Sequence, residues 1–218
     1  MMWAWHGGRR RYGWGVPEEK KKLRPIAMVF LWLTLPLYLL DQATKWWAVS
    51  RFSEPDPGRF STFDEKVTVI DGFLWWTRVH NQGVAFGLGN GTAWAPYVFL
   101  VVLVVALGAV SYFWRKGEFS TVGMRLAAAL LIAGILGNLT DRLFQGFWLE
   151  RWSEAGFFER LSKGYVVDFI DVRLPFYGHW PTFNVADACI SVAAVLLLIE
   201  TIRTEVAAKR KPASAPSA

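Results

Sequence analysis

One uncharged apolar run constrains this chain more than any other feature of its sequence. Residues 95–114 (APYVFLVVLVVALGAVSYFW) contain no Asp, Glu, Lys or Arg. A helix of about 20 apolar residues matches the thickness of the bilayer hydrocarbon. It also satisfies its backbone hydrogen bonds within the segment, which lipid requires. The run therefore predicts a membrane-spanning helix.

Three further segments are long and apolar enough to be spans. The four predicted spans cover residues 26–49, 93–114, 122–143 and 184–203. Hydrophobic residues make up 53% of the chain and charged residues 19%, so the composition excludes disorder over most of its length. A disulfide framework is excluded because Cys189 is the single cysteine. The expected fold class is a mainly α-helical, polytopic membrane protein with four transmembrane helices.

The basic residues set the expected orientation. Most of the 24 Lys and Arg residues fall on the cytoplasmic side if both termini are placed there, as the positive-inside rule requires. We therefore divide the chain into a basic cytoplasmic extension (1–25), a membrane domain (26–203) and a disordered cytoplasmic tail (204–218). The basic clusters flank the spans and form no basic face of a soluble module, so no nucleic-acid partner is predicted.

Both outer loops are expected to carry structure. Residues 66–79 are rich in Val, Thr, Ile and Trp around an Asp-Gly pair, which predicts a β-hairpin or small sheet. Residues 143–163 place aromatic rings at roughly helical spacing with charges between them. This pattern favours an amphipathic helix lying in the membrane interface, with an ordinary exposed loop helix as the alternative.

The polar residues of the spans and outer loops are expected at one depth relative to the membrane. An ionisable group inside a membrane costs several kcal/mol unless it is paired or hydrated. In the orientation above, the costly polar residues all lie near the outer membrane face. They are Asp41, Lys45, Asn81, Asn138, Asp141, Arg142, Asp168, Asn184 and Asp187. We therefore predict a polar, partly hydrated pocket at that level.

Most of these residues have a structural interpretation. Asp41 and Lys45 are four residues apart and should form a salt bridge on one helix face. Arg142 is expected to extend to the interface or to pair with a carboxylate. The asparagine amides are expected to act as hydrogen-bonding scaffold.

The remaining loop residues are assigned to the surface. Asp171, in the loop before the last span, is expected to be a water-exposed carboxylate. His80 and His179 are expected to be interfacial histidines. The spacing of His, Cys and carboxylates matches no metal site, so no metal and no cofactor is predicted.

Asp168 and Asp187 support a sharper hypothesis. If a loop and a helix bring them within a few Å, their like charges prevent both from being ionised together. One carboxyl would then hold a proton and the other would not. Such a pair can deprotonate a water and protonate a leaving amine. Spacing alone leaves two structural carboxylates as the alternative.

Five stretches carry a resemblance to a known family. They are DQATK (41–45), NQGVAFGL (81–88), GNLTDR (137–142), VVDFIDV (166–172) and FNVADACI (183–190). In this order, and on the expected spans, the chain resembles lipoprotein signal peptidase (signal peptidase II), a family of bacterial membrane aspartic peptidases. The resemblance implies an enzyme of the bacterial inner membrane. It would remove the signal peptide from diacylglyceryl-modified prolipoproteins by cutting before the lipid-modified cysteine.

The resemblance also assigns roles. It implies that Asp168 and Asp187 are catalytic. Further positions of the family motifs would shape the pocket, orient the aspartates and contact the substrate. They are Asp41, Lys45, Asn81, Gly83, Asn138, Asp141, Arg142 and Asn184. The implied partners are lipid-modified prolipoproteins and membrane lipids. Residues 143–163 are longer than the family pattern and look like an insertion, which could act as a lid or as an interfacial anchor.

Two other functions remain open from the residues. A small proton-coupled transporter also uses buried Asp and Arg, but its site would lie near the bilayer midplane. A structural membrane protein could use the same groups to hold its helices together. A serine hydrolase is disfavoured because the sequence contains no GxSxG motif.

Overall fold

The computed structural model describes residues 30–56, 59–62, 64–83, 89, 91–92 and 94–210. The predicted extension 1–25 lies outside these residues, as do positions 84–88 of the NQGVAFGL stretch.

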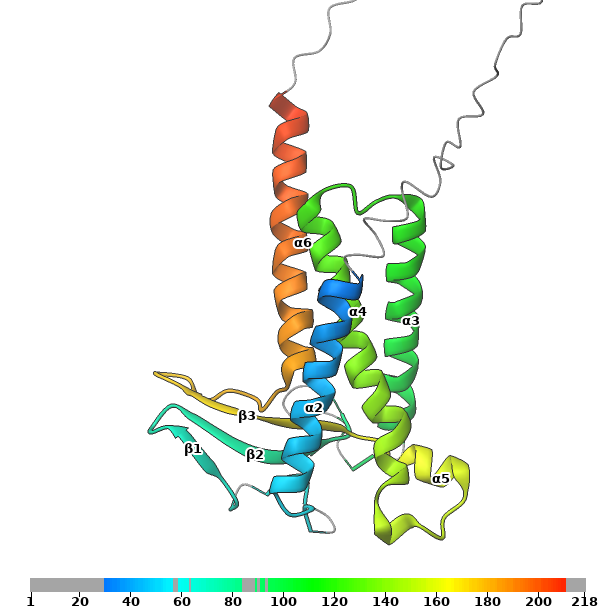
Figure 1. Ribbon diagram of the computed structural model, residues 1–218, viewed down its shortest axis with the longest axis vertical. Coiled ribbons are helices and arrows are strands. Elements are labelled where there is room, and N and C mark those ends of the chain that lie inside the picture. Colours follow the sequence, from blue (N-terminus) through cyan, green and yellow to red (C-terminus); the bar gives the residue numbers. More distant parts are fainter. Residues whose placement is uncertain are drawn as a thin grey trace, which may run out of the picture.

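Three helices are long and apolar enough to cross a membrane: α3 (Ala95–Lys116), α4 (Val122–Phe144) and α6 (Val185–Arg210). They stand side by side, with α4 between the other two (Figure 1). Gly117 ends α3 in the left-handed conformation (φ 78°), and the Thr121 hydroxyl caps α4 by accepting from the Met124 N–H at 3.0 Å. These local signals explain the short connection between the two helices.

The first predicted span corresponds to a π-helical turn, η1 (Phe30–Thr34), followed by α2 (Leu35–Arg51). Helix α2 has 17 residues, so it is shorter than the other three, and it contains Asp41, Lys45 and Arg51. It packs against α4, where the Thr34 hydroxyl donates to the Ala129 carbonyl at 3.0 Å. Whether this segment crosses the membrane stays a prediction.

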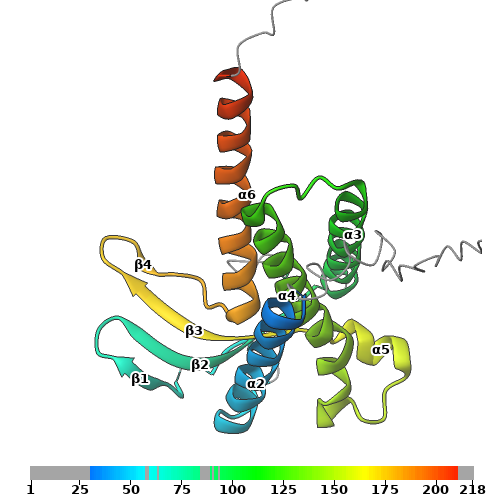
Figure 2. The same cartoon turned by 45° about the horizontal axis from the view of Figure 1, so that its top comes forward.

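A four-stranded antiparallel sheet lies at one end of the helices, in the order β1 (Val67–Ile70), β2 (Leu74–Asn81), β3 (Val166–Leu174) and β4 (Gly178–His179). The hairpin predicted over 66–79 is confirmed as β1 and β2. Figure 2 shows that the sheet projects away from the helices on one side. Its inner part packs on the end of α2 through buried apolar side chains: Ala48, Phe52, Leu149, Tyr165, Val167 and Phe169.

Strand β3 was not predicted, because Asp168 and Asp171 were placed in a loop. The two aspartates interrupt an apolar run that is otherwise typical of a buried strand. The run pairs with β2 in the register Val79 with Asp168 and Asn81 with Val166. Asp168 is therefore held on a strand, where its position is better fixed than on a loop.

Two other predicted boundaries differ from the structure. Residues 143–163 do not form one helix but three short ones, η3 (Gln145–Phe147), η4 (Glu150–Trp152) and α5 (Phe157–Ser162). Gly146 and Gly156 break the helical pattern, and Gly156 is extended where it begins α5. Helix α6 continues through Arg210, so the tail predicted over 204–218 begins inside this helix.

Candidate active site

Asp168 lies at the centre of the polar end of the structure. Its Oδ1 accepts from Asn184 Nδ2 at 2.7 Å and its Oδ2 from Asn81 Nδ2 at 2.9 Å. The side chain is buried among β3, β2 and the start of α6. Burial raises the pKa of Asp168 well above its usual range, and the neighbouring Asp187 carboxylate raises it further. This environment favours the protonated form of Asp168.

Asp187 lies in the first turn of α6. Its Oδ1 accepts from Asn138 Nδ2 of α4 at 2.8 Å. Asn184 caps the helix, because its Oδ1 accepts from the Asp187 N–H at 2.9 Å. The Asn184 side chain therefore contacts both aspartates: its oxygen bonds the backbone of Asp187, and its nitrogen bonds the carboxylate of Asp168.

The buried side chain of Lys45 contacts the amide of Asn138. Lys45 Nζ lies 2.9 Å from Asp41 Oδ2, 3.0 Å from Asp141 Oδ2 and 3.0 Å from Asn138 Oδ1. The side chains of Lys45, Asp41 and Asp141 are each 1% exposed. The ammonium group fixes the Asn138 oxygen, so the Asn138 nitrogen must face Asp187. The predicted Asp41–Lys45 salt bridge is confirmed, and Asp141 joins it.

The two carboxylates of this cluster also join the elements together. Asp41 Oδ1 accepts from the Ala186 N–H of α6 at 2.8 Å, and Asp141 Oδ2 accepts from the Val167 N–H of β3 at 3.0 Å. Gly137 permits this approach, because a Cβ there would lie 2.5 Å from Asp41 Oδ2. The cluster therefore sets the position of the backbone beside both site aspartates.

Arg142 plays a role that was not predicted. In place of a snorkelling contact or a carboxylate pair, its guanidinium donates to the main-chain carbonyls of Gln82 at 2.9 Å and Gly83 at 2.6 Å. Strand β2 ends at Asn81, so these carbonyls lie just beyond the strand. Arg142 thus holds the segment that follows Asn81.

A cleft of about 710 Å³ opens beside these residues. Asn81, Gly83, Asn138, Arg142 and Asp187 form its polar part. The apolar part comes from α3, α6 and the segment before α6. It includes Phe99, Val102, Leu103, Phe183, Ile190 and Val192. The cleft therefore offers a hydrogen-bonding floor and apolar walls that continue onto helices able to contact lipid.

The predictions for Asp171 and His80 were wrong. Asp171 is buried, and it accepts from Lys66 Nζ at 2.9 Å and lies 3.0 Å from His179 Nδ1. It thereby ties β3 to β4 through His179 and to the start of β1 through Lys66. His80 is buried too, stacked on Tyr165 with ring centroids 3.7 Å apart, and its Nε2 accepts from Arg78 Nε at 2.9 Å. Within the described residues, no three His, Cys, Asp or Glu side chains are placed to hold a metal ion.

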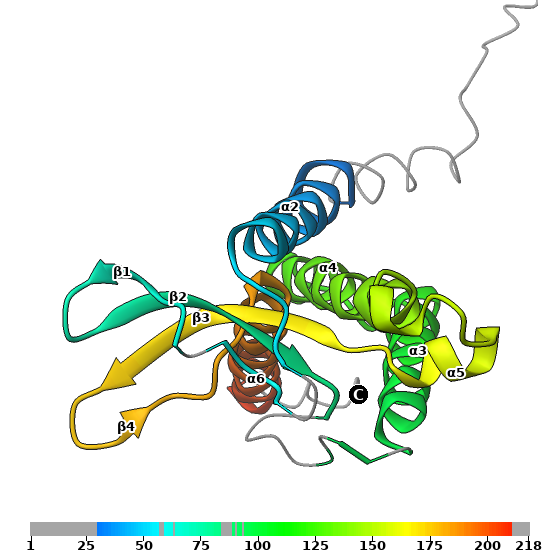
Figure 3. The ribbon, with the colours of Figure 1, turned by 90° about the horizontal axis from the view of Figure 1, so that it is seen from below.

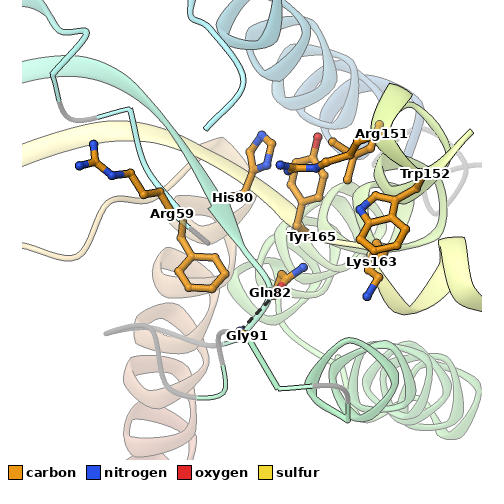
Figure 4. A pocket seen from close by; sticks show the side chains of 10 residues that line it. Arg59, His80, Gln82, Gly91, Arg151, Trp152, Lys163 and Tyr165 are labelled. Atoms are coloured by element: carbon orange, nitrogen blue, oxygen red, sulfur yellow. Dashed lines mark hydrogen bonds between the residues drawn. The ribbon is translucent and has the colours of Figure 1, made fainter. Parts of the chain in front are cut away.

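A second cavity, of about 250 Å³, lies across the 80–83 segment from the cleft. His80 and Gln82 line it (Figure 4), and Asn81 and Gly83 are among the residues that line the cleft. His80 and Asn81 are successive residues of β2, so their side chains point to opposite sides of the strand. Sequence reasoning missed this cavity. The period-2 pattern of the strand was the only available signal.

Comparison with known proteins identifies the family. The family model described as signal peptidase (SPase) II matches residues 33–203. The chain belongs to the signal peptidase II family. It is 31% identical to the lipoprotein signal peptidase of Psychromonas ingrahamii, covering 84% of this chain and 87% of that protein. It is 32% identical to the lipoprotein signal peptidase of Syntrophus aciditrophicus, covering 84% of this chain and 96% of that protein.

Solved structures agree with this assignment. One bacterial membrane enzyme superposes with a TM-score of 0.63 at 25% identity, over 85% of this chain and 93% of its own. A second gives a TM-score of 0.55 at 26% identity, over 79% and 91%. The chain is therefore a membrane protein of a peptidase family.

Proposed function

We propose that this protein removes signal peptides from lipid-modified prolipoproteins, with Asp168 and Asp187 as the catalytic pair. The observation that carries the proposal is the placement of these two aspartates. They come from different elements, β3 and α6, and both contact Asn184 beside a cleft with a polar floor. The names of the relatives support the same substrate class.

The different surroundings of the two carboxyl groups support different roles for them. Asp187 lines the cleft and, as the carboxylate, takes a proton from a water molecule. The water oxygen attacks the scissile carbonyl carbon while protonated Asp168 donates its proton to the carbonyl oxygen. The tetrahedral intermediate then collapses: the C–N bond breaks, and a proton passes from Asp187 to the leaving amine. Asp168 recovers its proton from the intermediate, so the pair ends as it began.

The cleft suits a substrate that is part lipid and part peptide. Apolar side chains of α3 and α6 can hold acyl chains, and each buried CH₂ contributes roughly 0.8 kcal/mol. The amides of Asn81 and Asn138 can bond a peptide backbone without the desolvation cost of a charge. We further propose that the site lies near the outer face of the inner membrane with both termini cytoplasmic. The basic residues of the chain ends and the polar cluster at the opposite end of the helices support this orientation.

The test is cleavage of a diacylglyceryl-modified prolipoprotein by the purified full chain in detergent. Asp168→Asn and Asp187→Asn should each lower the rate by about 10²–10⁴-fold or more, since acid–base groups contribute that much. Asp171→Asn is the matched control, because Asp171 is a buried carboxylate of the same strand whose partners are Lys66 and His179, in place of the Asn184 and Asn81 that contact Asp168. It should cut at close to the wild-type rate.

Thermal melting in the same detergent shows which variants are folded. An unlipidated precursor tests the substrate class and should be cut slowly or not at all. If folded Asp168→Asn and Asp187→Asn both cut like wild type, the aspartate mechanism is wrong. If wild type cuts both precursors equally, the proposed substrate class is wrong.

A further inference from the structure

The segment between α4 and β3 presents an exposed aromatic surface. Phe144, Trp148, Phe157 and Phe158 are 50–74% exposed. Their rings lie close in pairs, with centroids 6.5 Å apart for Phe144 and Trp148 and 5.4 Å apart for Phe157 and Phe158. We call these four side chains the aromatic surface. Clustered apolar groups of this kind mark a contact with a membrane or another molecule.

The backbone beneath the aromatic surface is held in place by contacts within the segment itself. The Arg160 guanidinium donates to the Phe147 carbonyl and lies 5.0 Å above the Phe147 ring. Gly146 packs directly on the Arg160 carbonyl, where a Cβ would overlap it. These internal contacts fix the backbone of the segment, so the fold itself sets the positions of the exposed rings.

Two contacts connect the aromatic surface to the helices. Tyr97, in the first turn of α3, donates its hydroxyl to the Phe158 carbonyl at 2.9 Å. Trp46 of α2 lies 5.1 Å from Trp148 between ring centroids. Further along α3, Val101 and other valines are exposed on a helix long and apolar enough to cross the membrane. The aromatic surface therefore continues a lipid-facing helix at its end, where Trp and Tyr are enriched in membrane proteins.

The position of the segment in the fold agrees with a lateral contact. Seen from below, α5 and the sheet project from opposite sides of the helices (Figure 3). The charges of the segment balance: Glu150, Glu154 and Glu159 offset Arg151, Arg160 and Lys163. A contact made by uncharged rings on a segment of no net charge does not depend on anionic lipid.

We propose that residues 144–163 form an interfacial anchor whose aromatic surface lies in the boundary between lipid headgroups and acyl chains. The occupant of this surface is the bilayer itself. The anchor supports the molecule on the side opposite the sheet and so fixes the height of the cleft relative to the lipid. This inference concerns membrane contact and does not depend on the proposed peptidase activity.

The single cysteine makes a direct test possible. Cys189 is buried and is replaced first by Cys189→Ala. A nitroxide label is then attached to Trp148→Cys or Phe158→Cys in the full chain, reconstituted in nanodiscs of neutral phosphatidylcholine. Glu154→Cys is the matched polar control in the same segment, and Val101→Cys is the lipid reference. Collisions with oxygen, which concentrates in lipid, are compared with collisions with a water-soluble nickel chelate.

The anchor predicts that labels at 148 and 158 favour oxygen over the nickel chelate several-fold relative to the label at 154. The ratio of oxygen to nickel collisions at 148 and 158 should approach the ratio at 101. It should stay the same when anionic lipid is added. Access of the nickel chelate to 148 and 158 equal to that at 154 would overturn the proposal. Protection from both reagents would overturn it too, because protein and not lipid would then cover the rings. So would a contact seen only with anionic lipid.

Discussion

Replacement of Lys45 by methionine tests the cluster that underlies the site. Methionine has nearly the shape of lysine without its charge, so the change leaves the buried carboxylates of Asp41 and Asp141 without their shared cation. Both carboxylates are 1% exposed and lie 2.9 and 3.0 Å from Lys45 Nζ. Removing one partner of a buried ion pair costs about 3–5 kcal/mol.

The expected loss can be measured by thermal melting of the purified protein in detergent. For a chain of this size each kcal/mol lowers Tm by about 2–4 °C, so Lys45→Met should lower it by about 6–20 °C. Lys116→Met is the control, because Lys116 is exposed at the end of α3, where its Nζ lies 4.8 Å from the centroid of the Tyr112 ring. Its Tm should change by about 1 °C or less, since such surface groups contribute little.

A second substitution distinguishes electrostatics from packing. Asp141→Asn added to Lys45→Met removes one uncompensated charge, and its amide oxygen can still accept from the Val167 N–H. The double variant should recover part of the lost Tm. If Lys45→Met melts with wild type, or if the added Asp141→Asn lowers Tm further, the reasoning from buried charge is refuted.

Three further predictions follow from the same contacts. Gly137→Ala should lower stability by about 1–3 kcal/mol, because its Cβ would lie 2.5 Å from Asp41 Oδ2. Burial and the Arg78 guanidinium hold the pKa of His80 well below its ordinary 6.5, so the folded state binds fewer protons than the unfolded state just below that pH. Stability should therefore fall as pH drops below about 6.5, by up to about 1.4 kcal/mol per pH unit, and His80→Gln should remove this slope. Arg142→Lys should lose one of two charged bonds to carbonyls, costing about 1.5–3 kcal/mol and slowing cleavage by about ten-fold or more.

Each of these predictions has a measurement that can contradict it. Gly108→Ala is the control for Gly137→Ala, since a Cβ at Gly108 meets nothing within 4 Å. Equal melting temperatures of these two variants would contradict the close approach. Parallel pH–Tm curves of wild type and His80→Gln would show that another group titrates. Wild-type cleavage kinetics in Arg142→Lys would show that the 82–83 carbonyls need no such hold.

The level of the site could be predicted because lipid makes polar groups expensive. Asp41, Asn138 and Asp187 each interrupt an apolar run, so the position of each in its helix is informative. The structure brings the groups from these helices together through Lys45 and Asn138, as their common level requires. The catalytic roles rest on the family resemblance and remain a proposal.

Contacts between distant segments could not be predicted from one sequence. Asp171 reads as a loop carboxylate until β1 and β4 bring Lys66 and His179 to it. Arg142 reads as a snorkelling or paired cation until the end of β2 places two carbonyls beside it. In both cases the deciding partner is supplied by tertiary structure, and no local pattern records it. The break of residues 143–163 into three short helices was foreseeable in part from Gly146 and Gly156.

The capping residue Asn184 is synthesised late, and this affects when the site can form. Asp168 is synthesised before Asn184 and Asp187, and helix α6 is the last element among the residues that the structure describes. Until α6 inserts, Asp168 lacks the Asn184 amide, and Asn138 lacks the Asp187 carboxylate. A nascent or truncated chain therefore holds only half of the proposed pair. Proteolytic capacity would then appear only on completion of the last helix, so an unfinished copy would do no cutting in the membrane.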